Sequence, residues 1–225
     1  MSADFIIFEC DNKNCLFRYP VRANSKFPKF CPRCKSPVSI ALEYSERPTD
    51  NVVSSHTNET SFSLLLDNLR SAYNVGSILR SADGFNITHI FLCGMTATPE
   101  NPKIFKTSLG AEDTISWSYS PNSLITVQNL KENGYYLYGL EIGPKSHPIY
   151  KIEKHKDNLN IVLIVGNELA GIDPQVRELC DEQIYIPMMG HKCSFNVTIA
   201  LGIAAFYLRY RNDFDNSTLN LHQSI

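Results

Sequence analysis

From residue 62 onward the chain alternates between short apolar runs and longer mixed stretches. The predominantly apolar runs are suited to buried parallel strands and lie at 62–66, 89–93, 135–140, 161–165 and 183–186. The mixed stretches predict helices near residues 75–85, 101–108, 121–133 and 173–180, with a last helix at about 196–211. This β–α alternation predicts an α/β fold, in which a parallel sheet is covered by helices on both faces.

The N-terminal region has a different pattern. It contains short β-like runs, which lie at 5–9, 16–21 and 38–44. The stretch that follows has almost no bulky apolar side chains and many Ser, Thr and Asn residues, which is typical of a linker. We therefore predict a small β domain at 1–44, a linker at 45–60, an α/β domain at 61–212 and a polar tail at 213–225.

Composition and the length of the apolar runs indicate where in the cell the protein is expected. Hydrophobic residues make up 43% of the 225 residues and charged residues 20%, as in a soluble globular protein. No apolar run approaches the roughly 20 residues that span a bilayer, and the first residues lack the basic start and cleavage site of a secretory signal. The expected location is the cytoplasm, with no membrane partner.

Charge is unevenly distributed. The whole chain has a formal net charge of −2, whereas residues 1–45 contain seven Lys or Arg against four Asp or Glu. That gives the N-terminal region +3 and leaves −5 for the rest. A basic module on an acidic body could supply contacts to RNA phosphates. Chance asymmetry in a short segment explains the same numbers equally well.

Four of the seven cysteines lie within residues 10–34. They form a Cys-x4-Cys pair and a Cys-x2-Cys pair with fifteen residues between, and such spacing is typical of zinc sites: Cys10, Cys15, Cys31 and Cys34. A region this short buries little apolar surface, so a bound Zn²⁺ would stabilise it as a zinc-ribbon-like domain. The alternative is four unligated thiols. Of the others, Cys93 and Cys180 are expected as buried small residues, and Cys193 has no paired base that would make it a nucleophile.

Three motifs in the second region carry candidate chemistry. The first follows the run at 62–66 and opens a helix, with Asn74 as a candidate cap and Arg80 two turns into the helix. The second ends the run at 161–165 in a glycine turn that carries one acid. It reads Gly166-Asn167-Glu168-Leu169-Ala170-Gly171-Ile172.

The third motif runs from Ile186 through a loop into the last predicted helix. Ser194 and Asn196 stand at the entrance of that helix, where capping alone would explain either residue. The helix is apolar on nearly every side as far as Ala205, so it must be buried within the body or against a second subunit.

Taken together and in this order, the three motifs resemble the SpoU/TrmH family of the SPOUT methyltransferase superfamily. The resemblance covers roughly residues 62–211. It implies a C-terminal trefoil knot, a homodimer formed through the knotted domain, and S-adenosylmethionine as cofactor. Backbone groups near five positions would hold that cofactor: Leu140, Gly166, Ile186, Met188 and Phe195. Phe195 departs from the family, which commonly has Leu there, and Thr198 stands where Ser is usual.

The implied reaction is methyl transfer to a ribose 2′-hydroxyl of tRNA or rRNA. That hydroxyl is a poor nucleophile, so it needs alignment and a proton acceptor. The family resemblance points to Arg80 for its activation. A guanidinium keeps its proton in proteins, so we expect Arg80 to hold phosphate and stabilise the developing alkoxide. The residues expected to orient Arg80, the ribose and the loops are Asn74, Glu168, Ser194 and Asn196.

Two alternatives remain, although the polar set of Asn74, Arg80, Ser194 and Asn196 argues against both. One is a SPOUT enzyme that methylates a base nitrogen instead of the ribose. The other is a catalytically silent RNA-binding or ribosome-assembly factor.

Overall fold

The computed structural model describes residues 4–45, 61–152 and 159–220, with side chains in the last helix as far as Arg211. By its internal contacts the chain divides into two compact units, Met1–His56 and Thr57–Ile225. Most of the predicted linker lies outside the described residues, and the predicted domain boundaries stay predictions. In the described part of the chain, no helix combines the length and apolarity needed to cross a membrane.

The first unit is a three-stranded antiparallel sheet with the strand order β2-β1-β3. Its strands are β1 (Phe5–Cys10), β2 (Arg18–Arg22) and β3 (Val38–Tyr44), close to the predicted runs. Alternate residues of β1 point inward, so the small core contains Ile6, Phe8 and Cys10 together with Cys31. So small a core supplies little stability by itself.

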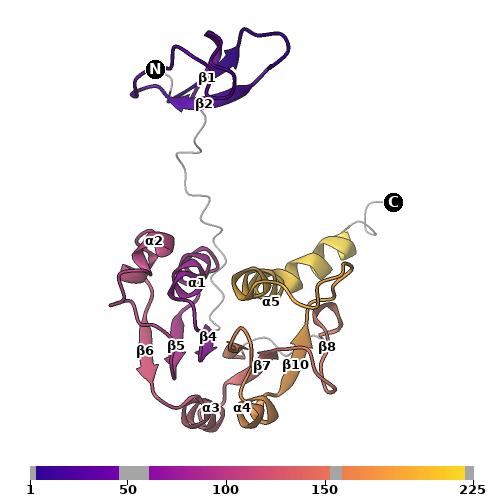
Figure 1. The fold of residues 1–225 in the computed structure, drawn as a ribbon. Helices are drawn as coiled ribbons and strands as arrows, with labels where there is room; N and C mark the ends of the chain where they lie inside the picture. Colours follow the sequence, from indigo (N-terminus) through magenta and orange to yellow (C-terminus); the bar gives the residue numbers. More distant parts are fainter. Residues whose placement is uncertain (1–3, 46–60, 153–158, 221–225) are drawn as a thin grey trace. The chain divides into compact units, whose positions relative to one another are not determined.

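The second unit is built on a seven-stranded sheet with the order β6-β5-β4-β9-β7-β10-β8 (Figure 1). All of its paired strands run parallel, as predicted. The strands are β4 (Phe62–Asp67), β5 (His89–Cys93), β6 (Trp117–Ser120), β7 (Tyr136–Leu140), β8 (His147–Pro148), β9 (Ile161–Val165) and β10 (Glu182–Tyr185). The helices are α1 (Ala72–Gly84), α2 (Phe105–Ser108), α3 (Ser123–Glu132), α4 (Pro174–Leu179) and α5 (Val197–Asn220), with single 3₁₀ turns at Ala111–Asp113 and Ile149–Lys151.

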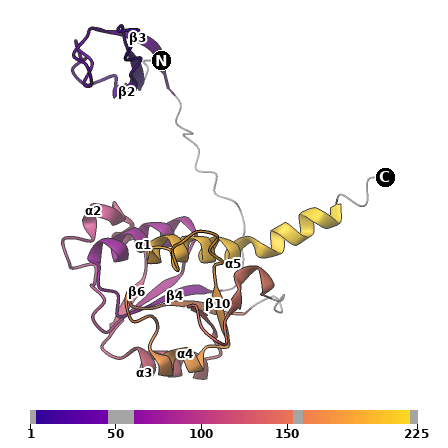
Figure 2. The same cartoon turned by 45° about the vertical axis from the view of Figure 1, so that its right-hand side comes forward.

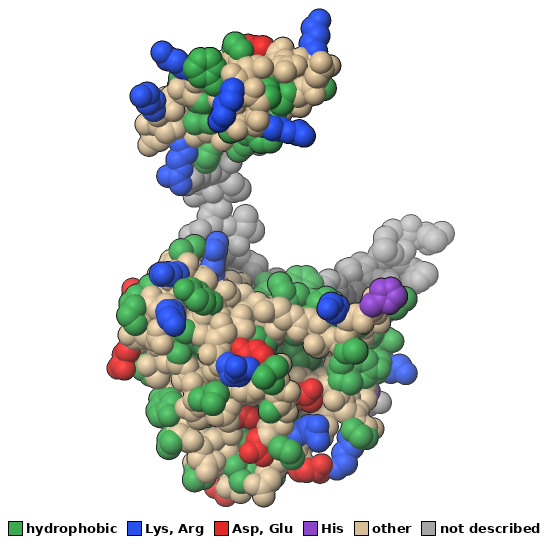
Figure 3. Space-filling view, in the orientation of Figure 1, with side chains coloured by type: hydrophobic (Ala, Val, Ile, Leu, Met, Phe, Trp, Pro, Cys, Tyr) green, Lys and Arg blue, Asp and Glu red, His purple; other side chains and the backbone are tan. Residues whose placement is uncertain are grey.

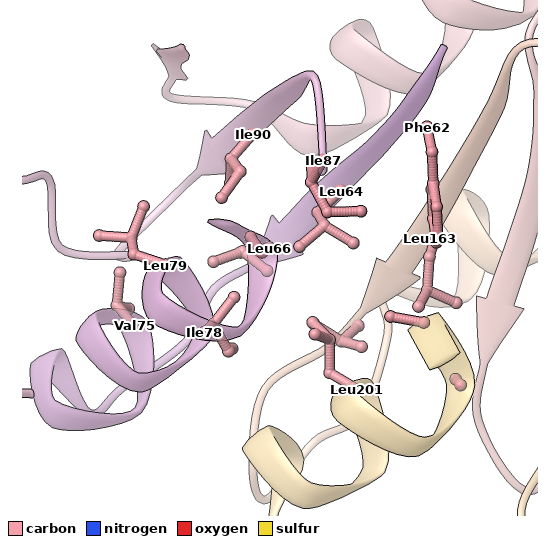
Figure 4. Close-up of a cluster of buried hydrophobic side chains, with 14 of the residues drawn as sticks. Phe62, Leu64, Leu66, Val75, Ile78, Leu79, Ile87, Ile90, Leu163 and Leu201 are labelled. Carbon is pink, nitrogen blue, oxygen red and sulfur yellow. The ribbon is translucent and has the colours of Figure 1, made fainter. Parts of the chain in front are cut away.

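Helices cover both faces of this sheet (Figure 2). Because side chains alternate along a strand, Leu64 and Leu66 of β4 point to one face and Leu65 to the other. The first face packs against α1 and α5, where Ile78 and Leu201 join the same buried cluster (Figure 4). The second face packs against α3 and α4. Helices α1 and α5 therefore lie side by side over the central strands.

Two strands were not predicted, and both lie at the edges of the sheet. Strand β6 has the sequence Trp-Ser-Tyr-Ser with half-buried or exposed positions, and β8 consists of only His147 and Pro148. An edge strand has one neighbour and partial burial, so it needs no apolar run and leaves no clear pattern in the sequence.

Three further expectations need correction. Ser71, rather than Asn74, caps α1, since the Ser71 hydroxyl accepts a hydrogen bond from the Asn74 backbone N–H. Helix α5 continues to Asn220, beyond its predicted end near residue 211. Cys93 is fully buried as expected, whereas Cys180 is only partly buried beside the α3 and α4 cluster.

Candidate functional site

A cavity of about 370 Å³ lies where the C-terminal ends of β7, β9 and β10 meet the start of α5. Its volume suits a small organic ligand, and the C-terminal edge of a parallel sheet is where such ligands bind. Four of the five expected cofactor residues line it, namely Leu140, Gly166, Ile186 and Phe195. The fifth, Met188, is not among the lining residues, and its expected role stays a prediction.

The loop after β9 forms one wall of the cavity and is held closed on itself. Asn167 and Gly171 exchange two backbone hydrogen bonds of 2.9 and 2.8 Å. A Cβ atom at Gly166 would overlap the backbone of Gly171 and Ile172, so a residue with a side chain does not fit there. The motif glycines therefore give the loop the tight path that shapes this wall.

The side chain of Asn167 stiffens the same loop from inside. Its Oδ1 accepts hydrogen bonds from the backbone N–H groups of Leu169 and Ala170, each 3.0 Å long. Its Nδ2 donates to the Asn68 carbonyl, 2.7 Å away, on the segment between β4 and α1. Asn167 thus ties the cavity wall to the first motif.

Glu168 makes the second and stronger tie to that motif. Its carboxylate accepts hydrogen bonds from the backbone N–H groups of Arg70 at 2.8 Å and Ser71 at 3.2 Å, and from Asn74 Nδ2 at 2.9 Å. The carboxylate therefore lies at the N-terminal end of α1, where the helix dipole favours a negative charge.

These bonds also set the charge of Glu168. Partial burial raises its pKa, but the donors on Arg70, Asn74 and Ser71 outweigh that effect and the net pKa is lowered. Glu168 is therefore a carboxylate at neutral pH, and both of its oxygens accept hydrogen bonds from the protein. Such a group positions its neighbours and is poorly placed to take a proton from a substrate.

Asn196 connects the third motif to the same group of residues. Its Oδ1 accepts a 2.8 Å hydrogen bond from the Thr198 backbone N–H, so the capping explanation for this residue is correct. Its Nδ2 also lies 3.4 Å from Asn74 Oδ1. Glu168, Asn74 and Asn196 thus form one polar chain that links all three motifs.

Ser194 and Arg80, the remaining candidates, do not take part in these hydrogen bonds. Ser194 lines the cavity, and Cys193 next to it is exposed. Arg80 is exposed on α1 and does not line the cavity, and within the described residues no hydrogen bond or ion pair reaches its side chain. Its guanidinium is therefore available to a group from outside this chain.

Glu141, which was not singled out in the sequence, also lines the cavity. Its carboxylate accepts hydrogen bonds of 3.2 Å from the backbone N–H groups of Ile142 and Ile172, and it lies against Gly171. This acid braces the cavity wall from the end of β7. An acid immediately after the predicted strand at 135–140 was the signal that could have identified it.

In the first unit, the four cysteine sulfurs all lie within 4.8 Å of one another. The Cys10 and Cys34 sulfurs are 3.4 Å apart and those of Cys15 and Cys31 are 3.9 Å apart. These separations are too long for disulfide bonds, and all four cysteines are free. Four thiolates around Zn²⁺ place their sulfurs about 3.8 Å apart, so the cluster fits a tetrahedral zinc ion.

We expect Glu168→Gln to destabilise the second unit by about 1 kcal/mol at neutral pH, because the amide nitrogen of Gln cannot accept hydrogen bonds. The lowered folded-state pKa means that the carboxylate stabilises the fold above its ordinary pKa of 4.5 and ceases to do so as the pH falls through the folded value. The difference between the two proteins should therefore shrink in acid.

Chemical denaturation followed by Trp117 fluorescence measures this difference, since the only tryptophan of the chain lies in β6 of the second unit. Glu132→Gln, an exposed acid at the end of α3, is the matched control and should change stability little. A difference for Glu168→Gln that stays constant from pH 7 to pH 3 would contradict the role given to this carboxylate.

Comparison with known proteins places this geometry in context. The model of the SpoU rRNA Methylase family matches residues 61–206. A protein from Vibrio parahaemolyticus named 23S rRNA (guanosine-2′-O-)-methyltransferase RlmB is 31% identical over 169 residues, which are 75% of this chain and 66% of that relative. The matched region thus spans just under two thirds of the relative's length.

Solved structures share the fold. An AdoMet-bound rRNA methyltransferase from Sinorhizobium meliloti superposes with a TM-score of 0.62 at 24% identity, over 68% of this chain and 56% of the other. The A. aeolicus TrmH/SpoU tRNA modifying enzyme superposes with a TM-score of 0.61 at 22% identity, over 70% and 78%. The parallel sheet with helices on both faces is therefore the SPOUT fold, and the chain belongs to the SpoU rRNA Methylase family.

Proposed function

We propose that this protein transfers the methyl group of S-adenosylmethionine to a ribose 2′-hydroxyl of tRNA or rRNA. One observation carries the proposal: a ligand-sized cavity is lined by the second and third motifs and joined through Glu168 to the helix that bears Arg80. The names of the similar proteins, an rRNA guanosine-2′-O-methyltransferase and a tRNA modifying enzyme, support the same substrate class.

S-adenosylmethionine would occupy the cavity against Leu140, Gly166, Ile186 and Phe195. The narrow backbone path at Gly166 leaves room for a ligand to approach main-chain N–H and C=O groups closely. An AdoMet-bound neighbour with the same fold supports this cofactor. When bound, it supplies a sulfonium methyl that is electrophilic toward an oxygen nucleophile.

The residues of the chain then have to align the RNA and manage one proton. The ribose hydroxyl would have to release its proton to a phosphate oxygen or water as its oxygen takes the methyl group that the cofactor would supply. Arg80, with no carboxylate partner among the described residues, would bind that phosphate and stabilise the developing negative charge. Asn74, Glu168 and Asn196 hold the start of its helix against the cofactor loops, while Ser194 faces the cavity.

The exposed face of α5 supports the expected homodimer. Ile199, Ile203 and Phe206 are 53%, 39% and 48% exposed and recur at the spacing of one helix face. Three large apolar side chains in one row are costly to leave in water, so a second copy of the chain is proposed to cover them. Such a partner could bring its own Arg80 toward this cavity.

The cysteine cluster is proposed to hold one Zn²⁺. All four sulfurs converge at distances that suit a tetrahedral ion, and the small core around them gives the unit little other stability. The metal would therefore be structural, with its coordination sites filled by Cys10, Cys15, Cys31 and Cys34.

For the reaction, we expect Arg80→Ala to lower methyl transfer by about 100-fold or more, because a charge-stabilising donor is lost. The cofactor affinity should stay unchanged, since Arg80 does not line the cavity. Mass mapping of the RNA product locates the methyl group, and calorimetry measures cofactor binding. A methyl group on a base nitrogen would establish the base-methylating alternative, and absence of cofactor binding at millimolar concentration would establish the silent factor.

For the homodimer, Ile203→Asp should convert the protein from dimer to monomer, because a buried unpaired carboxylate is strongly unfavourable in an apolar interface. Sedimentation equilibrium measures the mass. Ile125→Asp, which replaces an isoleucine of α3 that is 54% exposed, is the matched control and should leave the mass unchanged. A wild-type protein that sediments as a 25.4 kDa monomer at micromolar concentration would refute the dimer.

For the metal, the purified protein should contain about one zinc per chain, and Cys31→Ser should lose it along with the fold of the first unit. Elemental analysis and proteolysis of the N-terminal unit are the measurements. Cys193→Ser, which removes an exposed cysteine outside the cluster, should keep the zinc. Metal-free wild-type protein with a protease-resistant first unit would disprove the structural zinc.

A further inference from the structure

The first unit has a surface segment that combines cations with exposed aromatic rings. It lies between β2 and β3 and contains Lys26, Phe27, Lys29, Phe30, Arg33 and Lys35, all of them exposed. We call these six residues the basic aromatic segment. We propose that it binds an unpaired stretch of the RNA substrate, with a base stacked on Phe30 and phosphates held by the neighbouring cations. This inference rests on the proposed action on RNA.

The sequence around this segment has basic side chains and no acidic ones. Residues 12–42 contain seven Lys or Arg and no Asp or Glu. Among the described residues, Arg18 alone of these seven has a carboxylate partner, Glu9 at 3.3 Å. A zinc ion with four thiolates contributes a net charge of −2, so residues 1–45, which have seven cations and four acids, keep a net charge of +1. The segment therefore attracts a polyanion.

Basic side chains are also prominent on the surface of the first unit (Figure 3). On the face of the first unit that Figure 3 shows, Lys and Arg side chains project at many points and acidic side chains are scarce. Cations without carboxylate partners can release the counterions of a nucleic-acid backbone on contact with its phosphates. They explain affinity for RNA without explaining any preference for a base.

Phe30 supplies the second, independent observation. Its side chain is 59% exposed, although the ring is large and apolar. Phe27, which is 45% exposed, packs its ring against the buried Phe8 with centroids 5.7 Å apart and thus has a structural role. Phe30 is paired through its backbone with Pro37, and the adjacent Cys31 N–H donates to the Ser36 carbonyl at 2.8 Å. The Phe30 ring is therefore presented to solvent from a fixed turn.

A fixed, exposed ring among cations fits single-stranded RNA better than a duplex. Bases in a duplex are already stacked on one another, whereas an unpaired base has a free face that an aromatic side chain can cover. Phosphates on either side of the stacked base would then lie near Lys29 and Arg33, which flank Phe30 in the sequence. The second unit carries a net negative charge, so this segment would add contacts to RNA phosphates beyond the one proposed for Arg80.

The test uses the full-length, zinc-loaded protein and a fluorescent single-stranded oligoribonucleotide, with the same sequence annealed into a duplex as comparison. Anisotropy should show tighter binding of the single strand. Phe30→Ala should weaken that binding by about 10-fold, and Phe30→Tyr should preserve it while Phe30→Leu does not. Lys29→Ala should lower the dependence of log affinity on log salt by about 0.7.

Leu42→Ala is the matched control, because Leu42 is 51% exposed on β3 of the same unit but lies outside the segment. It should bind RNA as the wild type does. Zinc content confirms that each variant is folded, and if Phe30→Ala loses its zinc, the comparison of Phe30→Tyr with Phe30→Leu decides. Equal affinity of Tyr and Leu variants, or tighter binding to the duplex, would overturn the proposal.

Methylation assays separate this inference from the proposed function. If the wild type methylates RNA and Phe30→Leu binds and methylates it equally well, the segment has no role in RNA binding and the enzyme activity stands. If the wild type binds single-stranded RNA through Phe30 but methylates no RNA in the presence of S-adenosylmethionine, the segment stands and the proposed activity fails.

Discussion

The link between the loop after β9 and the start of α1 is the constraint on which the candidate site depends. Asn167 and Glu168 follow a strand at the centre of the sheet, and they bind backbone groups of residues 68–71, nearly one hundred positions earlier in the chain. The hydrogen bonds to Glu168 are charge-assisted and satisfy N–H groups that a helix start would otherwise leave without partners. The cavity wall and the helix bearing Arg80 are thereby held as one structure.

The polar residues of the site fall into two groups, those bonded within the protein and those available to a ligand. Glu168 and Asn196 form hydrogen bonds with other groups of the protein, so they act as positioning residues. Arg80 has no partner among the described residues, and Ser194 faces the cavity, so these two remain available to ligands. A similar separation holds in the first unit, where Cys10 and Cys31 are buried in the core while the basic side chains project into solvent.

Much of the fold was predictable because buried parallel strands are apolar along their whole length. The runs that became β4, β5, β7 and β9 each lie in the interior of the sheet, and their predicted bounds agree with the structure to within a residue. Strands β6 and β8 lack such a run because each has only one neighbouring strand and is partly exposed. The helix cap at Ser71 was misassigned to Asn74 because both residue types cap helices equally well.

The sequence by itself determined the α/β class, the order of the three motifs and the spacing of the four cysteines, since each of these is written in local residue types and distances along the chain. Only the tertiary structure decided which residues share the cavity. It brought in Glu141 from the end of β7, and it showed how Glu168 orients the loop after β9, through hydrogen bonds to the start of α1. The physical reason is that hydrogen-bond partners and burial depend on neighbours far away in the chain, which no local pattern records.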